Sequence, residues 1–264
     1  MSIFEDTLDN YASNNALADT NIYAKVIFAL GTMIINLFAQ SPIIPILIFL
    51  SFSSITILKA KIASRFYLKF ISVPLVFGLI TFLYMSLFFG SGEQILSLNI
   101  FNWGITAEGL NRGFLVLTKV MGGFSCLVFL ALTTPVNRLF ALCDEIHIPH
   151  IITDIALLMY RYIFVFLDVT LNIYNAQKTR LGYSGYKNSF QCLGILAGLV
   201  FIQTWEKSDE LYNTLLSRGY TGEIVLIHDR ETIYDLRKTQ LFLIGIFEVA
   251  LVIGILLSGT MNII

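Results

Sequence analysis

Charged residues are scarce in this chain. Asp, Glu, Lys and Arg make up 13% of its 264 residues, half of the roughly 25% that soluble domains carry. Hydrophobic residues make up 56%, including 22 phenylalanines, and they fall in long runs. This composition excludes an ordinary water-soluble domain and predicts an integral membrane protein. The formal net charge of −1 argues against nucleic acid as a partner.

The chain also lacks the motifs of several kinds of chemistry. No G-x-x-x-x-G-K-[ST] sequence is present, so we expect this chain to bind no nucleotide itself. Cys126, Cys143 and Cys192 are odd in number and show no C-x-x-C spacing, which predicts neither a disulfide nor a metal site. A proline separates His147 from His150, so the two do not share one continuous helix and we expect no metal there. No grouping of Ser, His and Asp predicts a catalytic site, and we expect no cofactor on this chain.

Five apolar runs predict transmembrane helices. They cover residues 22–39, 42–58, 70–89, 113–132 and 241–263. A helix needs about 17–25 apolar residues to cross a bilayer, so the first two runs are near the lower limit. Between the third and fourth runs, residues 93–112 read as a polar loop that contains a short interfacial segment at 96–101.

The cations indicate how these helices are oriented. Lys59, Lys61, Arg65 and Lys69 lie between the second and third runs, and ten more lysines and arginines lie in the long segment before the last run. Because connections rich in Lys and Arg stay in the cytoplasm, the N-terminus is expected inside and the C-terminus outside. The predicted organisation is a cytoplasmic tail at 1–21, transmembrane helices 1–4 at 22–133, a cytoplasmic region of two to three long helices at 134–240, and transmembrane helix 5 at 241–264.

Two stretches of the cytoplasmic region end in almost the same way. One reads Gln-Lys-Thr-Arg-Leu-Gly-Tyr-Ser-Gly (177–185), and the other reads Leu-Leu-Ser-Arg-Gly-Tyr-Thr-Gly-Glu (215–223). An arginine followed by glycine is a common way to end a helix, because the cation complements the helix dipole and glycine accepts a positive φ. The repetition favours a function as well: Arg180 and Arg218 are expected to present two guanidinium groups outward, as a two-pronged plug.

Two further patterns lie on the helices of this region. Gly194 and Gly198 have G-x-x-x-G spacing, which lets two helix backbones approach closely, and they predict a crossing of two helices. Asp154, Arg161 and Asp168 stand seven residues apart and share nearly one stripe of a helix. That stripe is either a solvated row of charges or, in a multipass membrane enzyme, a site for an anionic head group or for acid–base chemistry.

Two charged residues fall inside predicted spans. Lys119 and Glu248 are candidates for a functional role, because ionisable side chains are costly in the membrane. Lys119 is close enough to one end of its span for its side chain to reach the membrane surface. In that case the lysine would be tolerated there without having a functional role.

The second half of the chain resembles a known family, the transmembrane T component of energy-coupling-factor (ECF) transporters in its cobalt/nickel CbiQ-type branch. The segments that carry the resemblance are Leu-Thr-Thr-Pro (132–135), Ile-Pro (148–149), Tyr-Arg-Tyr-Ile (160–163), Ala-Gln-Lys-Thr-Arg-Leu-Gly-Tyr (176–183), Ala-Gly-Leu-Val-Phe (197–201) and Ser-Arg-Gly-Tyr-Thr-Gly-Glu (217–223). The first half matches the family only in its number of spans.

The resemblance implies a non-catalytic scaffold that joins two ABC-type ATPases to a small membrane subunit that captures the substrate. In this family two X-Arg-X motifs dock in grooves on the ATPases, which bind the ATP. The motifs correspond here to Thr179, Arg180 and Leu181, and to Ser217, Arg218 and Gly219. Two other functions stay open: an ABC permease that binds its own substrate, and the membrane enzyme described above. The sequence does not distinguish cobalt from nickel.

Overall fold

The computed structural model of the chain describes residues 8–13, 15–17, 20–89, 94–98, 103–145, 148–220 and 238–258. The chain divides into two compact units. Asp9–Pro135 and Glu231–Ile264 form one, which we call the membrane unit, and Met1–Leu8 with Val136–Arg230 form the other, which we call the hairpin unit. Residues 1–7, 14 and 18–19 of the predicted N-terminal tail, the middle of the 93–112 loop and the end of the last predicted span lie outside the described residues.

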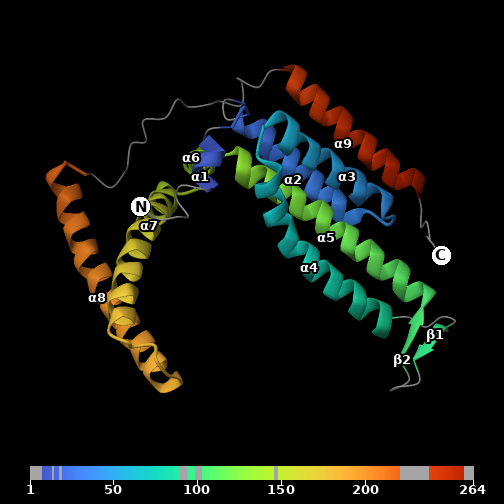
Figure 1. The fold of residues 1–264 in the computed structure, drawn as a ribbon. Coiled ribbons are helices and arrows are strands. Elements are labelled where there is room, and N and C mark those ends of the chain that lie inside the picture. Colours follow the sequence, from blue (N-terminus) through green and yellow to red (C-terminus); the bar gives the residue numbers. More distant parts are fainter. Residues whose placement is uncertain are drawn as a thin grey trace. The chain divides into compact units, whose positions relative to one another are not determined.

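The membrane unit is a helical bundle with one short β-hairpin (Figure 1). Its elements are most of α1 (Leu8–Ser13), α2 (Ile22–Phe38), α3 (Ile43–Ser54) continued by the π-helical turn η1 (Ile55–Lys59), α4 (Ser64–Phe88), β1 (Gln94–Leu98), β2 (Trp103–Thr106), α5 (Ala107–Thr133) and α9 (Lys238–Ser258). β1 and β2 pair antiparallel where the sequence predicted a polar loop with an interfacial segment.

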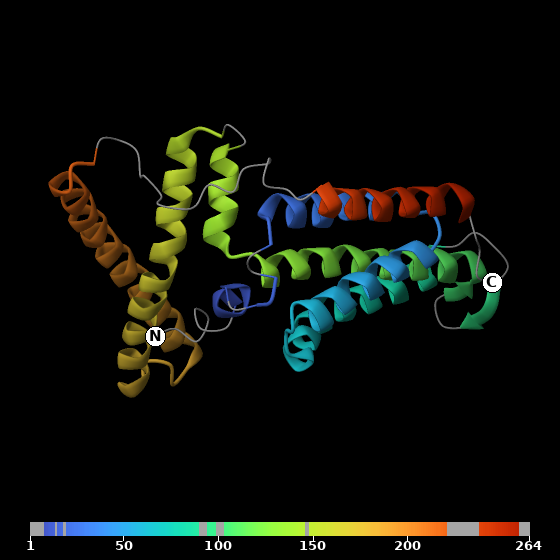
Figure 2. The ribbon, with the colours of Figure 1, turned by 90° about the horizontal axis from the view of Figure 1, so that it is seen from above.

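Helix α5 is the centre of this bundle, since it contacts α2, α3 and α4, while α9 packs on α2 and α3 (Figures 1 and 2). Four phenylalanines from four helices meet in its core. The ring of Phe28 lies 4.6 Å from that of Phe52, 6.0 Å from that of Phe129 and 5.5 Å from that of Phe247. We call this set the aromatic cluster. It joins α2, α3, α5 and α9. Contact between these rings therefore holds the last helix, α9, on the helices that precede the hairpin unit.

Glycines let α4 and α5 approach closely. A Cβ atom added at Gly109 would lie 2.7 Å from the carbonyl oxygen of Phe89, and one added at Gly113 would lie 3.1 Å from that of Phe82. Because the obstructing atoms belong to the backbone, no side-chain rotation could make room. Gly109 and Gly113 therefore form the G-x-x-x-G contact of this fold, and the sequence reading missed it because it placed Gly109 in a loop.

Several helices reach beyond the apolar runs that predicted them. Helix α4 begins at Ser64 rather than at residue 70, and α5 begins at Ala107 rather than at 113. The Thr106 side chain accepts a hydrogen bond from the amide of Gly109, and Glu108 pairs with Arg112 across one turn at 2.6 Å. These polar contacts stabilise a first turn outside the apolar run, because a helix ends where its caps are rather than where its hydrophobicity ends.

The exposed surface of the bundle is that of a membrane protein. By length and composition α4 and α5 are able to cross a membrane, and α2, the helix Ile43–Lys59 and residues Leu241–Leu257 are shorter apolar helices. Large apolar side chains of α4 are exposed, such as Phe77 at 66% and Ile80 at 61%. An exposed apolar surface of this extent would promote aggregation in water, whereas it is normal for a helix that contacts lipid. The predicted fold class, an all-α integral membrane protein, is confirmed.

The hairpin unit consists of α6 (Val136–Glu145), α7 (His150–Thr179) and α8 (Tyr186–Ser217). Helix α6 begins directly after Pro135, and α7 begins directly after Pro149; proline is common at the start of a helix, because its fixed φ suits the first turn. Helices α7 and α8 are joined by a short turn and contact each other (Figure 1). Among its described residues the unit therefore has three helices, where two to three were expected.

Candidate functional site

Both predicted arginines occupy the same position at the end of a long helix. Arg180 is the C-cap of α7 and Arg218 is the C-cap of α8, with nearly equal backbone angles (φ −89, ψ 16 and φ −91, ψ 7). Each end is closed by two backbone hydrogen bonds of 3.0–3.1 Å: Leu181 N–H to Lys178 O and Gly182 N–H to Gln177 O in α7, and Gly219 N–H to Leu216 O and Tyr220 N–H to Leu215 O in α8. This double closure is the Schellman motif.

The two ends differ in the residue that has a positive φ. In α8 it is Gly219, at φ 75, as the arginine–glycine pattern predicted. In α7 it is Leu181, at φ 58, and Gly182 follows one residue later. The predicted glycine stop is therefore correct for Arg218 and wrong for Arg180. Gly182 is needed for another reason, because a Cβ atom there would lie 2.7 Å from the Cys192 sulfur and 3.0 Å from the Gln177 carbonyl oxygen.

We expect exchanges at these two positions to change stability in opposite directions. A residue with a Cβ atom costs about 1–2 kcal/mol in the left-handed conformation. Leu181→Gly should therefore stabilise the end of α7 by about 1 kcal/mol, since Leu181 is 74% exposed and loses little packing. Gly219→Ala should destabilise the end of α8 by a similar amount. Thermal unfolding of the detergent-solubilised variants measures both, and shifts of the same sign would contradict the assignment.

The two arginines are exposed and far apart. Arg180 lies in the turn just before α8, and Arg218 lies at the other end of α8. A helix of 32 residues is about 48 Å long. The two prongs predicted from the sequence are therefore two separate guanidinium groups at the two ends of α8, which suits two separate partner sites; their docking stays a prediction.

The turn that carries Arg180 is held by side chains. The Tyr183 hydroxyl donates to Gln177 Oε1 at 2.7 Å, and Gln177 Nε2 donates to the carbonyl oxygen of Cys192 in α8 at 3.2 Å. The ring of Tyr183 packs 4.9 Å from that of Tyr174. Desolvation raises the pKa of the Tyr183 phenol above its ordinary value, so it stays a neutral donor at physiological pH. These contacts fix the orientation of the turn.

Away from the turn, α7 and α8 leave a groove of about 300 Å³ between them. Its lining comes from one face of each helix: Leu158, Met159, Tyr162, Ile163 and Phe166 of α7, and Thr204, Lys207, Ser208 and Leu211 of α8. The Lys207 ammonium donates to Glu210 at 2.6 Å, and this hydrogen bond raises the pKa of the lysine. The two helices are thus tightly connected at the turn and loosely packed along their length.

The predicted helix crossing at Gly194 and Gly198 does not occur within the described residues. A Cβ atom added at either glycine would meet no atom within 4 Å. The G-x-x-x-G spacing marks a flat strip on a helix, but it does not say which helix covers that strip. The physical reason for these two glycines therefore does not lie in contacts with the described residues of this chain.

The charges of α7 form a row rather than a cluster. Residues seven apart on a helix are about 10 Å apart along its axis. Asp154 is buried at 8% exposure, whereas Arg161 is exposed and Asp168 is half-buried. The three side chains are thus in different environments, and the spacing does not bring them to one point where acid–base chemistry takes place.

The other two predicted candidates, Lys119 and Glu248, lie in the membrane unit. Lys119 of α5 donates to the carbonyl oxygen of Leu37 at 2.9 Å. The Glu248 carboxylate of α9 lies against Gly31 of α2, and its Oε1 is buried with no hydrogen-bond partner among the described residues. Lys25 of α2 was missed by the sequence reading, although it is a third charge inside a predicted span. It is 5% exposed, and its ammonium donates to the carbonyl oxygen of Thr133 at 2.9 Å.

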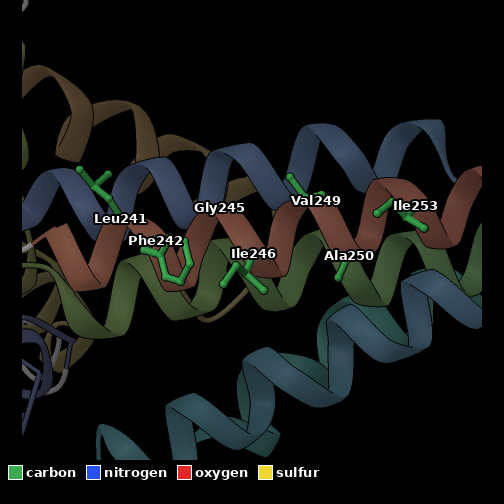
Figure 3. A pocket seen from close by; sticks show the side chains of 7 residues that line it. All are labelled: Leu241, Phe242, Gly245, Ile246, Val249, Ala250 and Ile253. Carbon is green, nitrogen blue, oxygen red and sulfur yellow. The ribbon is translucent and has the colours of Figure 1, made fainter.

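A shallow hollow lies along the outer side of α9. Its lining consists of seven residues that all belong to this helix: Leu241, Phe242, Gly245, Ile246, Val249, Ala250 and Ile253 (Figure 3). The lining contains no charged side chain, and Phe242 is 69% exposed. This face suits an apolar neighbour such as the interior of a bilayer.

Comparison with known proteins supplies the family. The model of a family described as CbiQ, cobalt transport protein, matches residues 13–227, a range that includes both arginines. An uncharacterized protein of Methanocaldococcus jannaschii is 36% identical over 93% of this chain and 91% of its own length.

Two other relatives have names that state a function. A putative fused cobalt transport protein CbiMQ of Methanocorpusculum labreanum is 32% identical over 96% of this chain, and the match covers 42% of that longer protein. The cobalt transport protein CbiQ of Salmonella typhimurium is 30% identical over 47% of this chain and 55% of its own length.

Proposed function

The chain belongs to the CbiQ family of cobalt transport proteins, and from this premise we propose that it is the transmembrane scaffold and coupling subunit of an ECF-type importer for cobalt or nickel ions. The observation that carries the proposal is the pair of matching helix ends, each a Schellman motif with an arginine, Arg180 or Arg218, as the C-cap. Two exposed guanidinium groups, presented in the same way at the two ends of a helix about 48 Å long, suit the docking of two copies of one partner.

The partners at these positions are two ABC-type ATPases. A guanidinium fork pairs well with a carboxylate, so each arginine inserts into an acidic groove on one ATPase. When the ATPases close on ATP, they displace the two ends of α8. Helices are stiff, and the hydrogen-bonded turn at Gln177, Tyr183 and Cys192 passes the movement of α8 to α7. The chain thus transmits the movement of the ATPases to the membrane, and ATP binds to those partners and not to this chain.

A separate small membrane subunit captures the ion. Support comes from the relative of Methanocorpusculum labreanum, which is named as a fusion and in which the matched region is less than half of the protein. The region like this chain is joined there to a longer remainder in one protein, so we expect this chain to bind a separate partner that corresponds to that remainder. The choice between cobalt and nickel belongs to the capture subunit.

Co-purification distinguishes this proposal from its alternatives. A tagged chain should bring down both an ATPase and a capture subunit, and Co²⁺ uptake into proteoliposomes should require all of them together with ATP. A permease that binds its own substrate would take up Co²⁺ with the ATPase alone. A membrane enzyme that uses the row of Asp154, Arg161 and Asp168 would need neither partner.

The proposed topology has five spans, the N-terminus inside and the hairpin unit in the cytoplasm. Asn188, an exposed residue in the first turn of α8, offers a labelling site. In a chain whose three native cysteines are replaced, Asn188→Cys should react with a membrane-impermeant thiol reagent in inside-out vesicles only. Labelling in right-side-out vesicles would place this region outside and reject the topology.

A further inference from the structure

Two lysines in the membrane unit cap each other's helices. The Lys25 ammonium of α2 donates to the carbonyl oxygen of Thr133, the last residue of α5. The Lys119 ammonium of α5 donates to the carbonyl oxygen of Leu37, the penultimate residue of α2. Both distances are 2.9 Å. Since 25 pairs with 133 and 37 with 119, the two helices are antiparallel, and each supplies a cation to the C-terminal end of the other.

The chemistry of both contacts is the same. The last four carbonyls of a helix have no partner within it, and the C-terminal end carries a partial negative charge. A lysine placed there satisfies one carbonyl and complements the dipole. An ionised side chain is expensive in a bilayer unless it has such a partner, so the two contacts also account for two lysines inside apolar helices.

The two caps differ in their surroundings. At the end of α5, Lys25 is 5% exposed and Thr133 is fully buried, and Asn15 Nδ2 donates to the neighbouring carbonyl oxygen of Leu132 at 3.2 Å. At the end of α2, Leu37 is 63% exposed. The bond that caps α5 is therefore buried beside a second side-chain bond, from Asn15. The capped residue of α2, Leu37, is exposed, although the preceding residue Asn36 is 2% exposed and donates to the carbonyl oxygen of Lys119 at 2.9 Å.

The end of α5 is also the place where the chain leaves the membrane unit. Only Thr134 and Pro135 separate Thr133 from Val136, the first residue of the hairpin unit. Thr134 is extended, with its amide bonded to the carbonyl oxygen of Leu130 at 3.1 Å, and the ring of Pro135 fixes its own φ. A connection this short can transmit a displacement of the hairpin unit only if the last turn of α5 stays in place.

We propose that Lys25 is a positioning residue for energy coupling, which holds the last turn of α5 on α2 so that movement of the hairpin unit is transmitted to the α2–α5 pair. Lys119 makes the same bond at the opposite end of the pair and has no part in this transmission. The inference rests on the proposed coupling function, and it adds a role for a residue of α2 that binds the end of α5 and is remote from both arginines along the chain.

Lys119 provides a matched control. The complete complex, with its ATPases and capture subunit, is reconstituted in proteoliposomes carrying Lys25→Met or Lys119→Met, and ATP hydrolysis and Co²⁺ uptake are measured together. Lys25→Met should assemble and hydrolyse ATP, while its uptake per ATP falls about tenfold or more, the factor expected for loss of one charged hydrogen bond. Lys119→Met should keep the wild-type ratio. A structural defect alone would lower the amount of complex and leave the ratio unchanged.

The opposite results are equally clear. A wild-type ratio in Lys25→Met, or an equal fall in Lys119→Met, would overturn the proposal. If Lys25→Met does not assemble, Asn15→Ala removes the adjacent bond to Leu132 without disturbing a charge, and it should lower the ratio by a smaller factor; an unchanged ratio there would also reject the role of this clamp. If the wild-type complex shows no ATP-dependent uptake, the proposed function fails rather than this inference.

Discussion

Replacing both Arg180 and Arg218 by alanine should abolish binding of the ATPases while the chain still inserts in the membrane. Removal of one partner of a buried interfacial charge pair costs about 2–5 kcal/mol, because the other charge is left unpaired. At 1.4 kcal/mol per tenfold, each substitution weakens docking roughly 30- to 3000-fold. The measurement is a pull-down of the ATPases by the tagged, detergent-solubilised variant.

The single variants and a lysine exchange give this experiment its controls. Because the two ends dock as parts of one assembly, either single alanine variant should retain some complex through the remaining contact. Arg→Lys keeps the charge but loses the two-pronged hydrogen bonding, so it should restore binding only in part. If the arginines act only as helix caps, each alanine costs about 0.3–1 kcal/mol of helix stability and docking stays intact. Wild-type binding by the double variant would reject the docking model.

The variant Gly109→Leu/Gly113→Leu should destabilise the membrane unit strongly. Both glycines face backbone carbonyls of α4, so a side chain can be accommodated only if the two helices separate. Overpacking of this kind typically costs about 1–3 kcal/mol per site. Expected results are a lower melting temperature in detergent and a lower yield of inserted protein.

Gly194→Leu/Gly198→Leu is the matched control, with the same residue types at the same spacing. An added side chain at these positions meets no atom within 4 Å, and Leu has the higher helix propensity by up to about 1 kcal/mol. The isolated chain should therefore unfold at the wild-type temperature or slightly above it. Equal destabilisation by both double variants would show that the α4–α5 contact is not the reason for the first effect.

The sequence predicts a helix end well where local chemistry decides it. The ends of α7 and α8 follow from arginine, glycine and the next polar residues, all within one turn, and the structure places both arginines as C-caps. The positive φ of Leu181 was not predictable, because leucine disfavours that conformation. Only the contacts of the surrounding turn hold it there.

Contacts between distant segments were predicted less well. The two G-x-x-x-G pairs have identical spacing, and the sequence predicts a contact at Gly194 and Gly198 because Gly109 falls in the expected polar loop, whereas close packing occurs at Gly109 and Gly113. Lys25 was overlooked because a lysine near the start of an apolar run usually extends to the membrane surface. Its buried hydrogen bond to Thr133 joins residues 108 apart in the chain, and no local sequence pattern predicts such a pair.

The aromatic cluster implies an order of assembly during synthesis. Three of its rings belong to α2, α3 and α5, but Phe247 belongs to α9, which the ribosome makes only after the whole hairpin unit. Roughly a hundred residues at about 5–20 per second separate the end of α5 from the start of α9, a delay of about 5–20 s. During that interval the nascent bundle lacks one of its four rings. A premature stop codon anywhere in the hairpin unit therefore leaves the membrane unit unfinished, although the lost hairpin helices are not part of it.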